Sequence, residues 1–360
     1  MRFLPEPDYR LGTGGRSAVV LINLGTPEAP SPGAVRRYLR EFLWDPRVVE
    51  IPRPVWWLIL NGIVLNTRPA ATARKYARIW LPEGSPLKVH TGAMARRLAG
   101  RLAGNGDTPM VRYAMRYGSP SIPDTLSALK AEGAQRIMIL PLYPQYAAST
   151  TGAVMDALAA WTTRTRNLPE LRLVRSFHDH PAYIGALAAS IRDQWRDRGC
   201  PDRLVMSFHG LPRYTLDRGD PYHCECHKTA RLLADALELP ATRWQLAFQS
   251  RFGRTEWLQP YTGDVLRKLG SEGTGRVDVV CPGFPADCLE TLEELGIEGR
   301  EIFIGAGGRD YRLLPCLNAS DVWIDGLATI ARDHLGGWKA PPAEEVAASA
   351  RRARGLGAPG

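Results

Sequence analysis

The sequence predicts an α/β protein made of two similar halves, each built on a parallel β-sheet flanked by helices. Nearly continuous apolar runs occur at residues 18–24, 136–142, 203–208 and 276–280, with helical stretches between them. Such runs are typical of parallel strands that are buried on both faces. A chain of 360 residues is long enough for two domains, each with its own core.

A weak internal repeat relates the two halves. Gly25-Thr-Pro27 after the first strand recurs as Gly210-Leu-Pro212, and Pro141-Leu-Tyr-Pro144 recurs as Pro282-Gly-Phe-Pro285. These two landmarks lie about 44 residues further apart in the first half, a difference too large for ordinary variation in loop length. We therefore expect an insertion over residues 45–88 that forms a lip over a cleft.

The other elements follow in order along the chain. The first strand leads into a helix that Ser31 caps and that has Pro32 in its first turn. A domain boundary is expected near Asn167, before the next apolar run. The expected units are an N-terminal extension (1–16), a first domain (17–168), a second domain (169–338) and a flexible tail rich in Ala, Arg, Pro and Gly (339–360).

The charge and the cysteine content of the chain indicate which partners and which cellular compartment to expect. The net charge of +9 and pI near 9.4 favour anionic partners, but the basic residues are scattered and form no nucleic-acid recognition motif. The N-terminal residues lack the apolar stretch of a signal peptide, and the six cysteines are typical of reduced thiols in a cytosolic protein. The sequence thus predicts a cytoplasmic location and no nucleic-acid partner.

The longest apolar stretch, Val55–Leu65, lies inside the expected lip. It is shorter than the roughly 20 residues that span a bilayer. Its paired Trp56 and Trp57, flanked by Arg53 and Arg68, are the residue types that favour a membrane surface. Peripheral contact with a membrane and burial in the core are both compatible with this pattern.

Two strand ends carry the strongest candidates for chemistry. His209 follows an apolar run and precedes a Gly-x-Pro turn, and Glu290 follows the run that ends at Val280. Ligands of open α/β sheets bind at the carboxyl ends of strands, so an imidazole and a carboxylate are expected to face one cleft. Imidazole suits both proton transfer and metal binding. A polar cap at the strand end is the alternative for His209.

Glu290 begins a row of acids with Glu294 and Glu298. Spacing by four residues places the three carboxylates along one helical face, where they repel, but such a row can conduct protons or guide a divalent cation. Gly296 interrupts the row, so an irregular helix is expected. The alternative is a capping box, in which Asp287 caps the helix and Glu290 reaches back to its backbone.

The segment His223-Cys224-Glu225-Cys226-His227 has the composition of a metal site. Ligand pairs in metal sites are usually well separated along the chain, so the pattern leaves a zinc site, an iron–sulfur cluster and no metal site open. The remaining cysteines are typical of small core residues. Arg68, Ser85, Arg116 and Tyr143 predict a cleft with cationic anchors and aromatic walls, suited to a flat acidic ligand.

Several ordered motifs make the chain resemble the ferrochelatases of Gram-negative bacteria over about residues 17–335. The resemblance implies two Rossmann-like domains of the type II chelatase fold, with a porphyrin cleft between them. The motifs are Leu21-Ile-Asn-Leu-Gly-Thr-Pro27, Gly84-Ser-Pro86, Leu142-Tyr-Pro-Gln-Tyr146, Ser149-Thr-Thr-Gly152, Ser207-Phe-His-Gly-Leu-Pro212, Gly219-Asp-Pro-Tyr222, Phe248-Gln-Ser-Arg-Phe-Gly253 and Asp287-Cys-Leu-Glu-Thr-Leu-Glu-Glu294.

The resemblance also implies roles for individual residues. His209 and Glu290 match the family's catalytic and metal-binding pair on opposite faces of the macrocycle, and Glu294 and Glu298 match the acidic row. Cys288 departs from members that have a second histidine at that position. The positions that match porphyrin contacts or the rim of the cleft are Leu24, Arg68, Ser85, Arg116, Tyr143 and Phe284.

The implied reaction inserts Fe²⁺, a substrate, into protoporphyrin IX and releases two protons to give protohaem in the last step of haem synthesis. Cluster-bearing members have a cysteine where this chain has Ala148 and further cysteines near the C-terminus, whereas the last cysteine here is Cys316. No iron–sulfur cluster and no permanent cofactor are expected. A chelatase for another metal or tetrapyrrole and a non-enzymatic porphyrin carrier remain alternatives.

Overall fold

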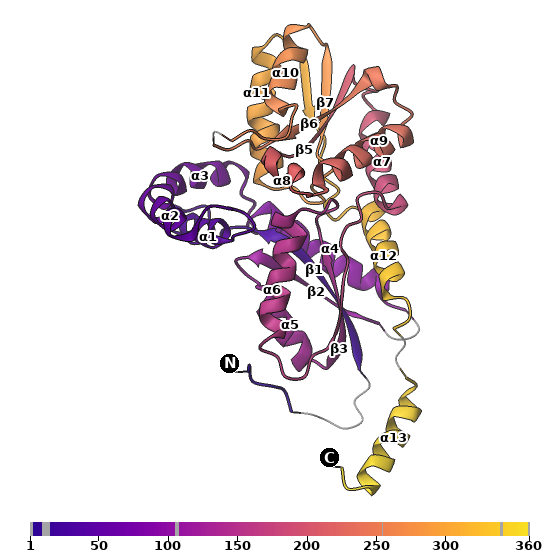
Figure 1. Ribbon diagram of the computed structural model, residues 1–360. Helices are drawn as coiled ribbons and strands as arrows, with labels where there is room; N and C mark the ends of the chain where they lie inside the picture. Colours follow the sequence, from indigo (N-terminus) through magenta and orange to yellow (C-terminus); the bar gives the residue numbers. More distant parts are fainter. Residues whose placement is uncertain (1–2, 9–14, 105–107, 254, 339–340, 359–360) are drawn as a thin grey trace.

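The computed structural model describes residues 3–8, 15–104, 108–253, 255–338 and 341–358. These residues form two four-stranded parallel sheets with helices on both faces (Figure 1). The elements of the first half are β1 (Arg16–Gly25), α1 (Pro32–Trp44), α2 (Arg53–Ile59), η1 (Leu60–Val64), α3 (Leu65–Ile79), α4 (Pro86–Leu102), β2 (Met110–Tyr117), α5 (Ile122–Ala131), β3 (Ala134–Pro141), η2 (Ala148–Gly152), α6 (Ala153–Thr162) and β4 (Glu170–Leu173). They continue with α7 (Pro181–Arg196), β5 (Arg203–His209), α8 (Arg213–Asp217), α9 (Tyr222–Ala236), η3 (Ala241–Arg243), β6 (Trp244–Gln249), α10 (Thr262–Ser271), β7 (Arg276–Val280), η4 (Glu290–Gly299), α11 (Arg300–Gly305), β8 (Asp310–Leu313), α12 (Asp321–Leu335) and α13 (Ala343–Gly355).

The two sheets have the same topology. Their strand orders are β2-β1-β3-β4 and β6-β5-β7-β8, which confirms the predicted fold class and the internal repeat. The expected strands are the central ones, whose side chains are buried on both faces. The edge strand β2 escaped prediction because Arg112 and Arg116 interrupt its apolar residues, and the edge position leaves Arg112 exposed and Arg116 partly buried.

The two halves exchange helices across the molecule. After the last strand of the first sheet, α7 packs beside α9 on the second half, whereas α12 packs beside α4 on the first half (Figure 1). In addition, β4 hydrogen-bonds to β3, with Arg136 opposite Glu170. The first sheet therefore runs to Leu173, and the expected boundary after residue 168 lies one strand too early.

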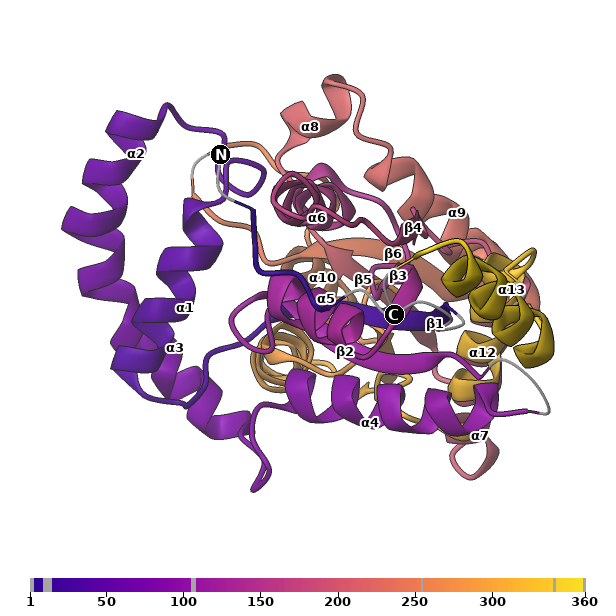
Figure 2. The same ribbon diagram turned by 90° about the horizontal axis from the view of Figure 1, so that it is seen from below.

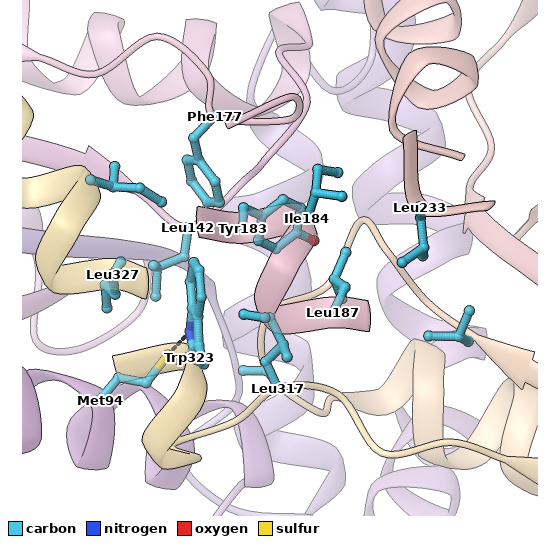
Figure 3. Close-up of a cluster of buried hydrophobic side chains, with 14 of the residues drawn as sticks. Met94, Leu142, Phe177, Tyr183, Ile184, Leu187, Leu233, Leu317, Trp323 and Leu327 are labelled. Carbon is cyan, nitrogen blue, oxygen red and sulfur yellow. Dashed lines mark hydrogen bonds between the residues drawn. The ribbon is translucent and has the colours of Figure 1, made fainter. Parts of the chain in front are cut away.

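One hydrophobic core joins the two halves (Figure 3). Trp323 of α12 is fully buried, and its ring centroid lies 6.0 Å from that of Phe177 and 5.4 Å from that of Tyr183. Its indole N–H points to the sulfur of Met94 on α4, at 3.2 Å. Because Trp323 of α12 packs against Met94 of the first half and against Tyr183 of α7, the two domains share a single packed interior.

The expected insertion over residues 45–88 contains α2, η1 and α3, which together with the preceding α1 form a helical unit that we call the lip. It has its own core cluster and projects from the side of the molecule (Figures 1 and 2). Trp56 is 5% exposed and donates its indole N–H to the carbonyl of Leu43, whereas Trp57 is 54% exposed. Trp56 is therefore part of the lip core, whereas Trp57 is exposed to solvent. None of the described helices combines the length and apolarity needed to cross a bilayer.

Candidate active site

His209 is the last residue of β5, at the carboxyl edge of the second sheet. Its Nδ1 lies 2.6 Å from the carbonyl oxygen of Gly210. A carbonyl oxygen only accepts hydrogen bonds, so Nδ1 is the donor and Nε2 takes no part in this bond. The rings of Trp257 and Phe284 flank the imidazole, each with its centroid 6.5 Å away. The side chain is therefore oriented through Nδ1 and by the two aromatic rings.

Glu290 begins η4, a π-helix that runs to Gly299. This π-helix packs closely against β8. The Tyr311 hydroxyl of β8 donates to the carbonyl of Leu295, and a Cβ at Gly299 would lie only 2.8 Å from the oxygen of that hydroxyl. At the start of η4, Gln249 of β6 donates to the carbonyl of Glu290 at 2.7 Å. π-Helical segments are rare in proteins overall, but those that do occur are often found at functional sites.

The capping-box alternative for Glu290 does not describe the structure. Asp287 accepts hydrogen bonds from Thr291 and from the amide of Asn318, at 3.0 and 2.7 Å. At the start of this helix the backbone N–H of Cys288 donates to the hydroxyl oxygen of Thr291, not to the Glu290 carboxylate. Among the contacts of the described residues, the Glu290 carboxylate bonds to no backbone N–H group and instead lines a cavity.

Glu294 interacts electrostatically with both predicted catalytic residues, His209 and Glu290. Ser250 donates to its carboxylate twice, from the backbone N–H and from the hydroxyl, both at 2.6 Å. Burial raises the pKa of Glu294 and the charge of Glu290 adds to this effect, whereas Ser250 and the neighbouring His209 oppose it. The three side chains thus share one electrostatic environment, and Glu294 is a carboxylate with increased proton affinity.

The rest of the acidic row faces the lip. Glu298 pairs with Lys75 of α3 at 2.5 Å. Glu293, which the sequence analysis missed, is 1% exposed and pairs with Lys75 at 2.9 Å and with Arg78 at 3.0 Å. The row therefore divides: Glu290 and Glu294 face the site, while Glu293 and Glu298 attach η4 to the lip. The prediction that the three acids share one face assumed an α-helix, whereas η4 is a π-helix.

A small cavity joins the first sheet, the lip and η4. Its volume is about 10 Å³, room for about one water molecule. Leu24, Ser85 and Glu290 of the predicted site line it. The other lining residues, which were not among the predicted site residues, are Gly25, Thr26, Tyr38, Tyr76, Leu87, Cys288 and Leu289.

Two buried polar atoms near these residues lack partners among the described residues, the Tyr143 hydroxyl and the Trp257 indole N–H. Such atoms are costly to bury, and both belong to residues beside the site. Tyr143 lies near Arg116, whose charge opposes the burial that raises the pKa of Tyr143. The Arg116 guanidinium itself pairs at 2.5 Å with Asp45, the residue that follows α1.

Arg68 lies at the rim instead of inside the cavity. Its guanidinium stacks on the ring of Phe252, 3.9 Å from the ring centroid, and burial lowers its pKa. Arg218 of the second half forms an exposed ion pair with Glu50 of the lip at 2.9 Å. Together with the Lys75 pairs, these contacts hold the lip against the second half.

Comparison with known proteins agrees with this geometry. The ferrochelatase family model matches residues 16–335. Ferrochelatases of Aromatoleum aromaticum and Dechloromonas aromatica are 60% and 59% identical, each over 99% of this chain and 99% of the relative. The chain belongs to the ferrochelatase family. This confirms the resemblance seen in the sequence and the expected enzyme class, metal insertion into a porphyrin.

Solved structures show the same fold at low sequence identity. The protein described as SirB from Bacillus subtilis with Fe³⁺ aligns with a TM-score of 0.53 and 13% identity, over 89% of this chain and 96% of that chain. CbiX, described as the terminal enzyme for siroheme biosynthesis in denitrifying bacteria, aligns with a TM-score of 0.50 and 14% identity, over 89% and 100% of the two chains. The predicted chelatase fold is thus confirmed.

The cysteine-histidine segment of this ferrochelatase-family chain divides between buried and open positions. Cys226 is fully buried, and the carboxylate of Glu225 accepts from the Tyr146 backbone N–H at 2.7 Å and from Arg175 at 3.1 Å. His223, Cys224 and His227 remain partly or fully accessible. Within the described ranges, no three His, Cys, Asp or Glu side chains are placed to hold a metal ion together.

Proposed function

We propose that this chain inserts Fe²⁺ into protoporphyrin IX to give protohaem, with His209 and Glu290 acting on opposite faces of the macrocycle. The observation that supports this most directly is the convergence of His209, Glu290 and Glu294 at one site, where burial raises the pKa of Glu294. The reaction releases two protons, so it needs bases beside the macrocycle.

The proposed division of roles follows from protonation states. With its hydrogen on Nδ1, His209 presents a lone pair on Nε2 that accepts a pyrrole proton. Glu290 contacts the metal from the η4 side, and Glu294 behind it takes up the second proton because its proton affinity is increased. A planar macrocycle keeps its nitrogen lone pairs in the ring plane, so a cleft that binds it buckled stabilises the transition state.

Substitution of His209 tests the assignment. His209→Ala is expected to abolish metal insertion while porphyrin binding, followed by absorbance and fluorescence, stays largely intact. His180→Ala is the matched control, because His180 lies at the start of α7 and pairs with Asp333. Normal turnover by His209→Ala with Fe²⁺ or Zn²⁺ would remove His209 from the mechanism.

The same absorbance assay separates the alternative functions. A chelatase for another metal or tetrapyrrole would prefer Co²⁺ over Fe²⁺ or coproporphyrin over protoporphyrin in a side-by-side comparison. A porphyrin carrier would bind the macrocycle tightly without turnover. Faster insertion of Fe²⁺ into protoporphyrin than of either competitor is the expected result.

The proposal includes no permanent cofactor and no iron–sulfur cluster. Cluster ligation needs thiolates, whereas burial raises the pKa of Cys281, Cys288 and Cys316 well above its ordinary value. Protein purified without air is expected to contain no acid-labile sulfide. Stoichiometric sulfide together with a visible charge-transfer spectrum would contradict this part of the proposal.

The proposal places the chain in the cytoplasm, with the lip as a peripheral contact to the inner membrane. Val55, Trp57, Leu58 and Ile63 of α2 and η1 are 52–64% exposed. Four large apolar side chains on one short segment, together with the net charge of +9, are the features of an anionic membrane surface contact. Trp56 takes no part because it is buried in the lip core.

Vesicle sedimentation tests the lip. Trp57→Ser combined with Leu58→Ser is expected to release the protein from vesicles rich in phosphatidylglycerol without lowering its stability. Leu168→Ser is the control, because Leu168 is 51% exposed on the body of the protein. If both variants sediment like the unchanged chain, the lip does not bind membranes.

A further inference from the structure

His223 and His227 form a pair of imidazoles on one face of α9, near its start. They are four residues apart, and their ring centroids lie 4.4 Å from each other. This is the helical spacing with which two histidines of a metalloprotease helix bind one zinc ion. The three residues between them do not obstruct the pair: Cys224 is exposed, while Glu225 and Cys226 are buried.

The rest of the fold holds this pair in place. The His223 ring stacks on Phe248 of β6 with centroids 5.8 Å apart, and the His227 ring lies 6.4 Å from the same ring. No hydrogen bond to another described residue occupies a nitrogen of either imidazole. Burial lowers the pKa of both, and Arg213 adds to the effect on His223. Two imidazoles whose nitrogens bond to no other described residue therefore lie side by side.

We propose that His223 and His227 form a second metal site, which binds a borderline divalent cation such as Zn²⁺ or Ni²⁺ through two imidazoles. Water fills the remaining coordination positions. Imidazole nitrogen suits these ions, and Fe²⁺ stands lower in the affinity series, so the site favours other metals over the proposed substrate. The assignment does not depend on the proposed function, because it uses no residue of the cleft.

Titration with Ni²⁺ tests this site in the complete chain. Isothermal calorimetry is expected to show that the His223→Ala/His227→Ala double variant binds one Ni²⁺ ion fewer per chain than the unchanged protein. The same comparison in the His209→Ala background excludes a contribution from the cleft. His90→Ala is the matched control, since His90 is a half-buried histidine on α4 without a histidine neighbour on its helix, and its Ni²⁺ binding should not change.

Each outcome decides the assignment. Equal Ni²⁺ stoichiometry and affinity in the double variant and the unchanged chain would overturn it. If the double variant does not fold, His227→Gln alone replaces one of the two ligands and must weaken Ni²⁺ binding. Cys224→Ser is expected to leave binding unchanged; weaker binding in that variant would show a thiolate ligand and contradict the two-imidazole site.

Discussion

The hydroxyl of Ser250 offers a direct test of the role of Glu294. Ser250→Ala removes one of the two hydrogen bonds that Ser250 donates to this carboxylate. Ser250 opposes the burial that raises the pKa of Glu294, so its loss raises that pKa further. Because the ionised form of Glu294 accepts the proton, the acidic limb of the pH profile should move to higher pH.

The magnitude follows from the energy of the lost bond. A hydrogen bond to a charged group contributes about 1.5–3 kcal/mol, and water replaces part of it in a partly exposed site. A pKa shift of one unit corresponds to about 1.4 kcal/mol. We therefore expect the acidic midpoint of kcat/KM for Zn²⁺ insertion to rise by about one pH unit, with little change in the rate at higher pH.

Ser250→Gly separates the hydroxyl from the backbone. Ser250 has a φ of 65°, a conformation that costs an L-residue roughly 1–2 kcal/mol. Glycine adopts it freely and keeps the backbone N–H, so both variants should show the same pH shift, although the glycine variant should be the more stable. Ser127→Ala is the control, since Ser127 bonds to Trp161 on α6. Unchanged acidic limbs in both Ser250 variants would refute the role of Glu294.

Three further predictions concern stability. Glu294→Gln should lower kcat/KM but stabilise the fold, because burial raises the folded-state pKa of Glu294 above 4.5. Below that ordinary pKa the variant and the unchanged chain should be equally stable, and the stability advantage of the variant should grow as the pH rises through the raised pKa. Urea unfolding at several pH values measures this difference. Lys75→Met should lower the free energy of unfolding by about 1.5 kcal/mol, because buried Glu293 loses one of its charged partners. The same substitution should lower it by less when Glu293→Gln is already present. Equal losses in the two backgrounds would exclude the Lys75–Glu293 pairing. Trp323→Ala should cost about 3–5 kcal/mol in the same assay, and a cost below 1 kcal/mol would contradict the shared core.

The sequence located the central strands and the two strand-end residues because their signals are local. A buried parallel strand needs a continuous apolar run, and its carboxyl end must stop at a turn. His209 and Glu290 carry these signals in their immediate neighbours. Tyr38 and Tyr76 do not, since their apolar helical spacing resembles that of any core residue, and only their position beside Glu290 reveals them as parts of the cavity wall.

Other parts of the site depend on contacts between distant segments. The π-helical geometry of η4, which directs Glu294 toward Ser250 and Glu293 toward α3, is accompanied by packing against β8. A spacing of four residues cannot show this, because the pattern assumes α-helical turns. Trp56 and Trp57 are adjacent in sequence, yet only the packing of α2 on α1 and α3 determines which of them is buried.

The sequence by itself determined the α/β class, the twofold repeat, the family and the pair His209 and Glu290. The tertiary structure decided which helix covers which sheet, since α7 and α12 cross to opposite halves, and which acids face the site. The physical reason is the range of the interactions. Apolar periodicity and strand-end turns act over a few residues, whereas burial, ion pairing and the pKa of Glu294 arise from groups brought together only when the chain has folded.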